Sequence, residues 1–395
     1  MGNTSPKPSN LSQSSVDGVY IQRGEDLCQN LNSSLSGRSF ASVSSHQSTY
    51  SVSRPWSRVS RRRWKESTLT LPYESSKTAW PVSQTESFFL PEFPLLTNNK
   101  ENKFENLGEI NKGAFGKVYK VKDEKGDVYA LKVLSKSKII KENAVRQVKD
   151  EVQIQRVCGH HPYIVDCPFH WQSKKRLYIV SEYVAGGELY NLLKTYAVLP
   201  VALVKIYIAQ LALALDFLHN AGIIYRDLKP ENILLDANGN VQLIDFGLSK
   251  WLSYGKTTRT ICGTLLYMAP EILAHLEYGH SVDWWSLGVI ACLMLTGKYP
   301  STEADSADEP ETRRVRLPQH ELEVPARDLL LRLLQFEPTK RLRSLRTLQT
   351  IAFYKDFNFE NVKTKKMKPL DLLPERPQEE IMEFEDFDGN YDTVL

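Results

Sequence analysis

The chain is poor in cysteine and carries little net charge. Its 395 residues include five cysteines, which are scattered without the paired spacing of a zinc site. An odd cysteine count without a signal peptide argues against a disulfide framework and favours free thiols in a reducing compartment. The formal net charge of +3 gives no overall basis for nucleic-acid binding, so we expect no nucleic-acid partner.

Long apolar runs are absent as well. The most apolar long stretch covers residues 286–295, which is too short to span a bilayer and contains a glycine. We therefore expect no transmembrane segment. A chain of 395 residues exceeds one ordinary domain and has room for a catalytic unit of about 250 residues with extensions at both ends.

The first hundred residues lack apolar periodicity. Serine and threonine dominate residues 1–102, and prolines are scattered through them. Such a segment cannot bury enough surface to offset the entropy lost on ordering, so we predict that residues 1–103 form a largely disordered extension. Within it, the phenylalanine-rich residues 88–93 leave two alternatives open, packing onto the domain that follows or an irregular linker.

The same extension contains two features that bear on membranes. Five basic residues and two tryptophans gather in residues 56–65, a composition compatible with a solvated charge run, an anionic membrane surface or a nuclear address. Residues 1–6 nearly match the N-myristoylation pattern, but Pro6 stands where the pattern requires Ser or Thr. Peripheral membrane contact therefore remains an alternative.

The most informative motif is Tyr-Arg-Asp-Leu-Lys-Pro-Glu-Asn at residues 225–232, followed by Asp-Phe-Gly at 245–247. Transfer of a γ-phosphoryl group needs a carboxylate that accepts the proton of the attacking hydroxyl and oxygen ligands for Mg²⁺. Asp227, Asn232 and Asp245 provide these groups. A single Asp in a loop is more often a turn residue, but the complete string indicates phosphoryl transfer.

Residues that could hold a nucleotide lie upstream. Residues 107–121 alternate apolar and polar side chains around a Gly-x-x-Gly turn, which predicts two strands joined by a phosphate-covering loop. An apolar run then ends in Lys132, which can reach the α- and β-phosphates. Valines spaced at i, i+3 and i+7 predict an amphipathic helix over 144–157. Its Glu151, rather than the shorter Asp150, is the candidate carboxylate to hold Lys132.

With these motifs, the chain resembles the eukaryotic protein kinases, in particular the AGC serine/threonine branch, over residues 104–391. The branch-level markers are Tyr225 before Arg-Asp, Thr-Ile-Cys-Gly-Thr at 260–264 and Asp-Trp-Trp-Ser-Leu-Gly at 283–288. The nearest resemblance is to ribosomal-protein kinases and cyclic-nucleotide-dependent kinases. It implies an α+β, bilobal fold. A small antiparallel β lobe with one main helix would cover 104–184, a large, mostly helical lobe 185–353 and a C-terminal tail 354–395.

The resemblance also implies an activity, which is transfer of phosphate from ATP, with Mg²⁺, to Ser or Thr of proteins with Arg or Lys upstream. The protein would act in intracellular signalling in the cytoplasm, with the nucleus or a peripheral membrane as further locations.

By resemblance, Lys132 and Glu151 form an ion pair, Asp227 is the catalytic base, Lys229 steadies the γ-phosphate, and Asn232 and Asp245 bind Mg²⁺. The implied nucleotide contacts are Asn111, Gly113, Gly116, Val118, Ala130, Lys132, Glu182, Val184 and Glu188.

Regulation and substrate choice follow from the same resemblance. Thr260 occupies a position that an upstream kinase would phosphorylate, and Arg226 and Lys250 could pair with its phosphate. Glu188 and Glu231 match contacts to a substrate arginine three residues before the phosphoacceptor. The resemblance further pairs Glu271 with Arg341 in the large lobe.

The chain departs from the family pattern in four places. Asn111 replaces the first glycine of the phosphate loop, which predicts weaker nucleotide binding. Ser181 replaces a bulky residue before the hinge and is expected to open a pocket behind the adenine site. Leu293 and the pair Leu265-Leu266 stand where relatives carry acidic or Pro-Glu residues, so little selection is expected at a second substrate arginine. Residues 301–322 are short and polar where relatives place a helix.

The C-terminal tail has two interpretations. Residues 384–388 mimic a hydrophobic motif that docks on the small lobe, whereas residues 387–391 mimic a segment that tethers across the nucleotide site. Only about 30 residues follow Phe357 before this region, too few to wrap around the small lobe. The tether is favoured, and a hydrophobic motif in cis is inferred to be missing. This inference, Asn111 and the short region 301–322 motivate an alternative function, a catalytically weak or inactive kinase-fold scaffold or allosteric partner. The complete set of chemical residues argues against it.

Overall fold

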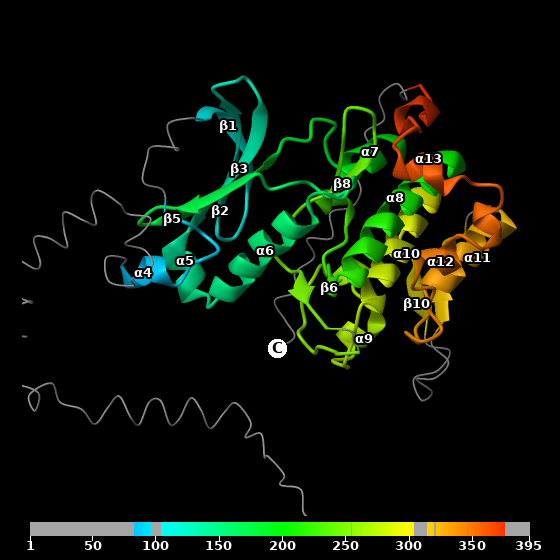
Figure 1. Cartoon of the computed structure of the whole chain (residues 1–395). Helices are drawn as coiled ribbons and strands as arrows, with labels where there is room; N and C mark the ends of the chain where they lie inside the picture. Colours follow the sequence, from blue (N-terminus) through cyan, green and yellow to red (C-terminus); the bar gives the residue numbers. More distant parts are fainter. Residues whose placement is uncertain (1–82, 96–103, 254, 304–313, 320, 376–395) are drawn as a thin grey trace, which may run out of the picture. The chain divides into compact units, whose positions relative to one another are not determined.

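The structure, a computed structural model, describes residues 83–95, 104–253, 255–303, 314–319 and 321–375 (Figure 1). The chain divides into two units, residues 1–75 and residues 76–395, and every described residue lies in the second unit. The architecture within this unit is a β-rich small lobe followed by a helical large lobe, so the predicted α+β bilobal fold is confirmed.

The small lobe is built on one antiparallel sheet of five strands in the order β1-β2-β3-β5-β4. The strands are β1 (Phe104–Lys112), β2 (Gly116–Asp123), β3 (Val128–Ser135), β4 (Phe169–Gln172) and β5 (Arg176–Glu182). Two helices accompany the sheet, the short α5 (Lys136–Lys141) and the longer α6 (Val145–Cys158). The helix predicted over 144–157 is thus confirmed, with Val148 and Val152 buried against side chains of β3 and β5.

Residues 83–95 pack onto the small lobe. They contain α4 (Gln84–Ser87), and the side chains of Phe89 and Phe93 are completely buried in the same apolar cluster as α6. The prediction that residues 1–103 are disordered is therefore wrong for 83–95, because two phenylalanines at i and i+4 bury enough apolar surface to order a short segment. Of the two alternatives for residues 88–93, packing is confirmed. Residues 1–82 and 96–103 lie outside the described part, as do the basic cluster and the N-terminal pattern.

The large lobe is organised around two apolar helices, α8 and α10. Its helices are α7 (Leu189–Tyr196), α8 (Val201–Asn220), α9 (Pro270–Leu273), α10 (Ser281–Thr296), α11 (Val324–Leu333) and α12 (Leu345–Leu348). Every residue of α10 is buried, as are 13 of the 20 residues of α8. By length and composition alone α8 could cross a membrane, but most of it lies inside the core of the lobe.

Short strands and 3-10 turns connect these helices and carry the loops of interest. Strand β6 (Ile223–Ile224) pairs with β9 (Lys250–Trp251), and β7 (Ile233–Leu235) pairs with β8 (Val241–Leu243). The 3-10 turns are η3 (Pro230–Asn232), η4 (Leu265–Tyr267), η6 (Ala352–Tyr354) and η7 (Pro369–Leu372). The polar region 301–322 contains a hairpin of β10 (Ser301–Glu303) and β11 (Arg314–Arg316), with residues 304–313 and 320 outside the described part.

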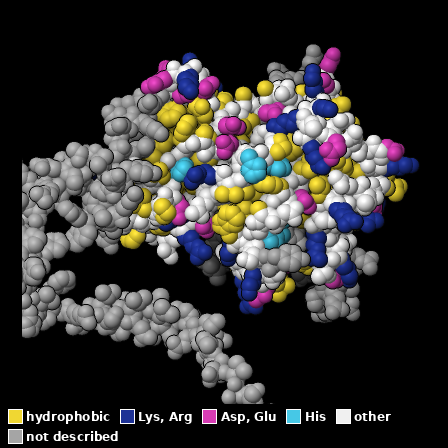
Figure 2. All heavy atoms as spheres, viewed as in Figure 1, with side chains coloured by type: hydrophobic (Ala, Val, Ile, Leu, Met, Phe, Trp, Pro, Cys, Tyr) yellow, Lys and Arg dark blue, Asp and Glu magenta, His cyan; other side chains and the backbone are white. Residues whose placement is uncertain are grey.

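The described part of the tail follows the large lobe. Helix α13 (Phe359–Lys363) buries Phe359 and Val362 in the core that contains α8, and the Tyr163 hydroxyl donates a hydrogen bond to the Val362 carbonyl. Residues 376–395 lie outside the described part, so the tether remains a prediction. Four of the five cysteines are described, and all four are free thiols. On the face shown in Figure 2, basic and acidic side chains are interspersed.

Candidate active site

The loop that carries Asp227 is held by a buried carboxylate. Asp283, in the first turn of α10 and completely buried, accepts hydrogen bonds from the backbone N–H groups of Tyr225 (2.9 Å) and Arg226 (2.8 Å). Arg226 has a positive φ of 69°, a conformation that a residue with a side chain adopts only under constraint. The two hydrogen bonds to Asp283 provide that constraint and thereby fix the backbone next to Asp227.

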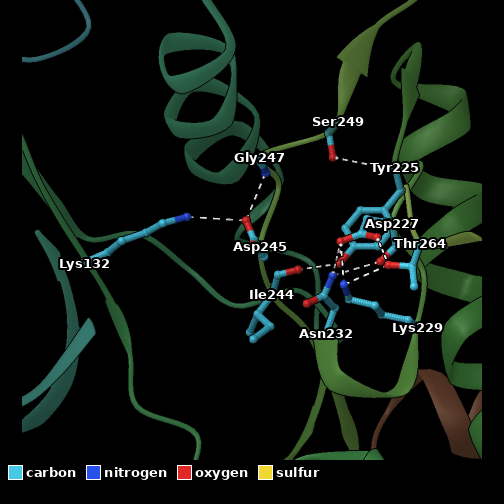
Figure 3. A network of polar contacts seen from close by, with 10 residues as sticks. All are labelled: Lys132, Tyr225, Asp227, Lys229, Asn232, Ile244, Asp245, Gly247, Ser249 and Thr264. Carbon is cyan, nitrogen blue, oxygen red and sulfur yellow. Dashed lines mark hydrogen bonds and ion pairs between the residues drawn. The ribbon is translucent and has the colours of Figure 1, made fainter. Parts of the chain in front are cut away.

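Asp227 lies at the centre of a polar cluster with Lys229, Asn232 and Thr264 (Figure 3). The Asn232 amide nitrogen donates to the Asp227 carboxylate at 2.8 Å and to its backbone carbonyl at 2.9 Å. Thr264 donates to the other carboxylate oxygen at 3.0 Å. The Lys229 ammonium lies 3.3 Å from Asp227 and donates to the Thr264 hydroxyl at 2.9 Å. These contacts fix the rotamer of Asp227, and the Lys229 ammonium places one positive charge next to its carboxylate.

A second cluster joins the two lobes through Lys132. Its ammonium lies 2.6 Å from a carboxylate oxygen of Glu151 on α6 and 3.4 Å from Asp245 in the large lobe. Burial lowers the pKa of Lys132, but the charges of Asp245 and Glu151 outweigh it and raise the pKa above its usual value. Burial raises the pKa of Glu151, against the opposing effect of Lys132. The lysine is therefore a permanent cation at neutral pH.

Asp245 is an ionised carboxylate in a constrained loop. Its φ is 53°, and one of its oxygens accepts the backbone N–H of Gly247 at 3.1 Å. The Lys132 ammonium lowers the pKa of Asp245. The Tyr225 hydroxyl donates to the carbonyl of Ile244, which connects this loop to the Asp227 loop (Figure 3). The structure thus brings together the six residues to which the sequence assigned chemistry: Lys132, Glu151, Asp227, Lys229, Asn232 and Asp245.

The phosphate loop is the turn between β1 and β2. Gly113 donates its N–H to the carbonyl of Gly116 at 2.9 Å, which closes the turn. A Cβ at Gly116 would lie 1.8 Å from the carbonyl oxygen of Val133 on β3, so this position requires glycine. Asn111 lies within strand β1, paired with Val118. Strand backbone does not require glycine, and the weaker nucleotide binding expected from Asn111 remains a prediction.

The remaining candidate nucleotide contacts flank the segment between the lobes. Val118 pairs with Lys132, and Ala130 pairs with Ser181, whose hydroxyl lies 3.5 Å from the Ala130 carbonyl. Glu182 is the last residue of β5, and residue 184 follows in the connection to α7. Glu188 is the N-cap residue of α7. Val118, Ala130 and Glu182 thus lie on strands of the sheet that also contains Lys132, whereas Glu188 lies at the start of α7.

Glu188 and Glu231 form an electronegative pair. Burial and the charge of Glu231 raise the pKa of Glu188. One carboxylate oxygen of Glu231 is buried and has no hydrogen-bond partner among the described residues. A buried acceptor without a donor is costly, so the pair is suited to an external cation. Leu265 and Leu266 are half exposed and Leu293 is buried, and none of them can supply a further charge.

Thr260 lies among polar groups of the activation segment, residues 245–271. Its backbone carbonyl accepts the Tyr278 hydroxyl at 2.5 Å, and Arg226 donates to the same hydroxyl at 3.3 Å. The Lys250 ammonium donates to Thr258, whose hydroxyl lies 3.3 Å from that of Thr260. Each predicted phosphate partner therefore contacts a residue that in turn contacts Thr260: Arg226 contacts Tyr278, and Lys250 contacts Thr258.

The end of this segment is fixed by an ion pair in the large lobe. Arg341 makes two hydrogen bonds to Glu271, at 2.7 and 2.9 Å, and both side chains are buried. The predicted pairing of these residues is confirmed. Thr264 and Asp283 belong to strings that mark the family, but their contacts with the loop that carries Asp227 were not predicted from the sequence. The signal for Asp283 was an acidic residue at the start of an otherwise apolar helix.

The comparisons with known proteins agree with this geometry. The model of the protein kinase domain matches residues 104–352. Ribosomal protein S6 kinase-related protein from Homo sapiens is 39% identical over 329 residues, which cover 80% of this chain and 78% of the relative. The cAMP-dependent protein kinase catalytic subunit of Dictyostelium discoideum is 36% identical over 71% of this chain and 44% of its own length. Serine/threonine-protein kinase sck2 of Schizosaccharomyces pombe is 42% identical over 73% and 46%.

Proposed function

The chain belongs to the protein kinase family and is an ATP-dependent serine/threonine kinase, and on this premise we propose that it phosphorylates protein sites with an arginine three residues before the phosphoacceptor. The observation that carries this proposal is the Glu188–Glu231 pair, which presents a buried carboxylate oxygen without a donor among the described residues. A planar guanidinium supplies donors in a geometry that matches a carboxylate.

The roles of the chemical residues follow from their contacts. The Asp227 carboxylate, held by Thr264 and Asn232, accepts the proton of the substrate hydroxyl as that oxygen attacks phosphorus. The Lys229 ammonium beside it stabilises negative charge on the transferred group. Lys132, held by Glu151, binds the α- and β-phosphates of ATP. Each role requires a fixed side chain, and each of these side chains has at least one charged or polar partner.

The donor set between the lobes fits Mg²⁺. Asp245 supplies carboxylate oxygens, and Asn232 uses its amide nitrogen toward Asp227, which leaves its amide oxygen for other contacts. Protein sites bind Mg²⁺ through one or two such oxygen ligands together with substrate phosphates. Within the described residues no cluster of three or more His, Cys, Asp or Glu occurs; Asp245 and Asn232 would hold the ion together with the phosphates of the nucleotide. When bound, Mg²⁺ neutralises charge on the phosphates.

The alternative of an inactive scaffold finds no support in the site. Loss of catalysis in a kinase fold usually leaves a gap at the lysine, the base or the metal ligands, whereas Lys132, Asp227 and Asp245 are all present and lie within hydrogen-bonding distance of their partners.

A peptide experiment tests the specificity proposal. Two peptides that differ only by arginine or alanine three residues before serine are phosphorylated by wild-type protein and by the Glu231→Gln variant, which leaves the candidate nucleotide contact Glu188 intact. The wild type is expected to prefer arginine by at least tenfold in kcat/KM, because a desolvated charge pair is worth more than about 1.4 kcal/mol. The variant is expected to lose that preference while retaining transfer to the alanine peptide. Equal rates on both peptides with the wild type would refute the proposal.

A further inference from the structure

Residues 83–95, termed here the N-terminal anchor, contact the helix that carries Glu151. We propose that the anchor is a positioning element of the active site that holds α6 so that Glu151 stays paired with Lys132. This inference rests on the kinase activity of the chain and adds to it a requirement for a segment outside the residues that match the kinase domain model. In Figure 1, α4 lies beside α5 at the end of the small lobe.

The anchor has its own local structure. Ser83 and Glu86 form a reciprocal capping pair, in which the Ser83 hydroxyl accepts the Glu86 N–H at 3.3 Å and a Glu86 oxygen accepts the Ser83 N–H at 3.2 Å. This arrangement satisfies backbone donors that the first turn of a helix leaves without partners. The turn continues to Phe93, whose N–H donates to the carbonyl of Phe89 at 2.8 Å. The anchor therefore presents Phe89 and Phe93 from an ordered turn.

Both phenylalanines insert into the apolar core behind α6. Their rings are completely buried and lie edge to face with centroids 6.4 Å apart. The apolar cluster that contains them also includes side chains from α5, α6, β3, β5 and the adjoining loops: Leu134, Ile139, Ala144, Val148, Val152, Cys167, Leu177 and Ile179. By contrast, the neighbouring Phe88 is 46% exposed. The anchor thus fills the space between α6 and the sheet with two rings of its own.

Polar contacts tie the anchor to α6 on either side of Glu151. The Lys149 ammonium forms an ion pair with Glu92 at 2.6 Å and donates to the carbonyl of Leu90 at 2.8 Å. The Gln153 amide donates to Glu92 at 3.1 Å. Lys149 and Gln153 lie one helical turn apart, two residues before and two residues after Glu151. A movement of this turn of α6 would break all three contacts.

The other side of the anchor is fixed to β4. The Gln172 amide nitrogen donates to the carbonyls of Phe93 at 2.5 Å and Glu86 at 3.2 Å, and its oxygen accepts from Lys136 at 2.5 Å. The buried Lys136 ammonium lies 5.3 Å from the centre of the Phe89 ring. Because the anchor is bonded to both α6 and β4, it links the helix to the sheet.

The anchor affects catalysis through the distance between Lys132 and Glu151. The Lys132 ammonium and the Glu151 carboxylate are 2.6 Å apart, one on β3 and the other on α6. Without the anchor, α6 loses two buried rings and three polar contacts, and the helix becomes free to move relative to β3. Lys132 would then spend less time in the position that binds phosphates, which lowers the rate of transfer.

The test compares the Phe89→Ala/Phe93→Ala variant with Phe88→Ala, a matched change at an exposed neighbour. The double variant is expected to lower kcat at least tenfold, and Phe88→Ala is expected to change it less than twofold. A synthetic peptide of residues 83–95, added at increasing concentration, is expected to restore kcat to the double variant. Hydrogen exchange is expected to rise in α6 of that variant and to stay unchanged in α10, which separates positioning from global destabilisation.

A second, milder variant tests the proposal even if the double variant does not fold. Glu92→Ala removes the ion pair with Lys149 and is expected to lower kcat severalfold, with faster hydrogen exchange in α6. An active wild type together with unchanged kcat in folded Phe89→Ala/Phe93→Ala, or in Glu92→Ala, would overturn the inference. Absence of transfer by the wild type would instead count against the kinase activity on which the inference rests.

Discussion

Replacement of Glu271 with glutamine removes one charge from a buried ion pair and leaves the other charge in place. The guanidinium of Arg341 is completely buried and makes two hydrogen bonds to Glu271. It also donates to the backbone carbonyls of Ser281, Gln335 and Phe336. The Glu271→Gln variant keeps the size of the side chain, so the change in stability reports the unpaired charge rather than a cavity.

The expected cost can be estimated from these contacts. Removal of one partner of a buried ion pair typically destabilises a protein by about 3–5 kcal/mol. The three backbone carbonyls that remain bonded to Arg341 solvate part of its charge, so we expect a value near the lower end, about 3 kcal/mol. The pair between Arg259 and Glu277 has a similar distance of 2.9 Å but is exposed, and Glu277→Gln is expected to cost less than about 1 kcal/mol.

Urea unfolding of the two variants and the wild type measures these differences. A further variant, Glu271→Met/Arg341→Met, removes both charges and is expected to be more stable than Glu271→Gln, because no charge is left unpaired. If Glu271→Gln destabilised the protein no more than Glu277→Gln does, the reasoning from burial would be refuted.

Three further predictions concern the small lobe and the segment between the lobes. Ser181→Met is expected to confer resistance to adenine analogues with enlarged substituents, and equal inhibition of wild type and variant would count against a pocket behind Ser181. Burial lowers the pKa of Lys136 to about 8 from 10.5. The unfolded chain therefore binds more protons between about pH 8 and 10.5, and stability should rise with pH there. Thermal unfolding should show Lys136→Met losing this rise, and parallel curves would contradict it. A Cβ at Gly186 would lie 2.4 Å from the Leu235 carbonyl, so Gly186→Ala should lower the melting temperature, whereas Gly279→Ala, with open space around it, should not.

The chemical core of the site was predictable because its motifs are local in sequence and tied to one reaction. The strings around Asp227 and Asp245 and the run ending in Lys132 indicated phosphoryl transfer, and the family inference supplied the pairing of Lys132 with Glu151. The helix that carries Glu151 was predictable from valine periodicity alone, since its buried face repeats every three to four residues.

The N-terminal anchor was harder to predict because composition averages over a hundred residues. Serine and threonine dominate that region, and two buried phenylalanines do not change the average. A local signal was present, since Ser83 and Glu86 have the spacing of a capping box and Phe89 and Phe93 are one helical turn apart. The strand position of Asn111 was not predicted for a related reason. Family position suggested a turn, whereas the pairing of Asn111 with Val118 places it in a strand, and strand pairing is not visible in a single sequence.

Asp227 and its partners carry out the transfer of phosphate from ATP to Ser or Thr. The most direct measurement is transfer of radiolabelled phosphate, with Mg²⁺ present, to a serine peptide that carries arginine three residues upstream, by wild type and by Asp227→Asn. The wild type is expected to transfer phosphate, and the variant is expected to be slower by at least a hundredfold, because general base catalysis contributes a factor of about 10²–10⁴. No transfer by folded wild type with phosphorylated Thr260, or equal transfer by the Asp227→Asn variant, would contradict it.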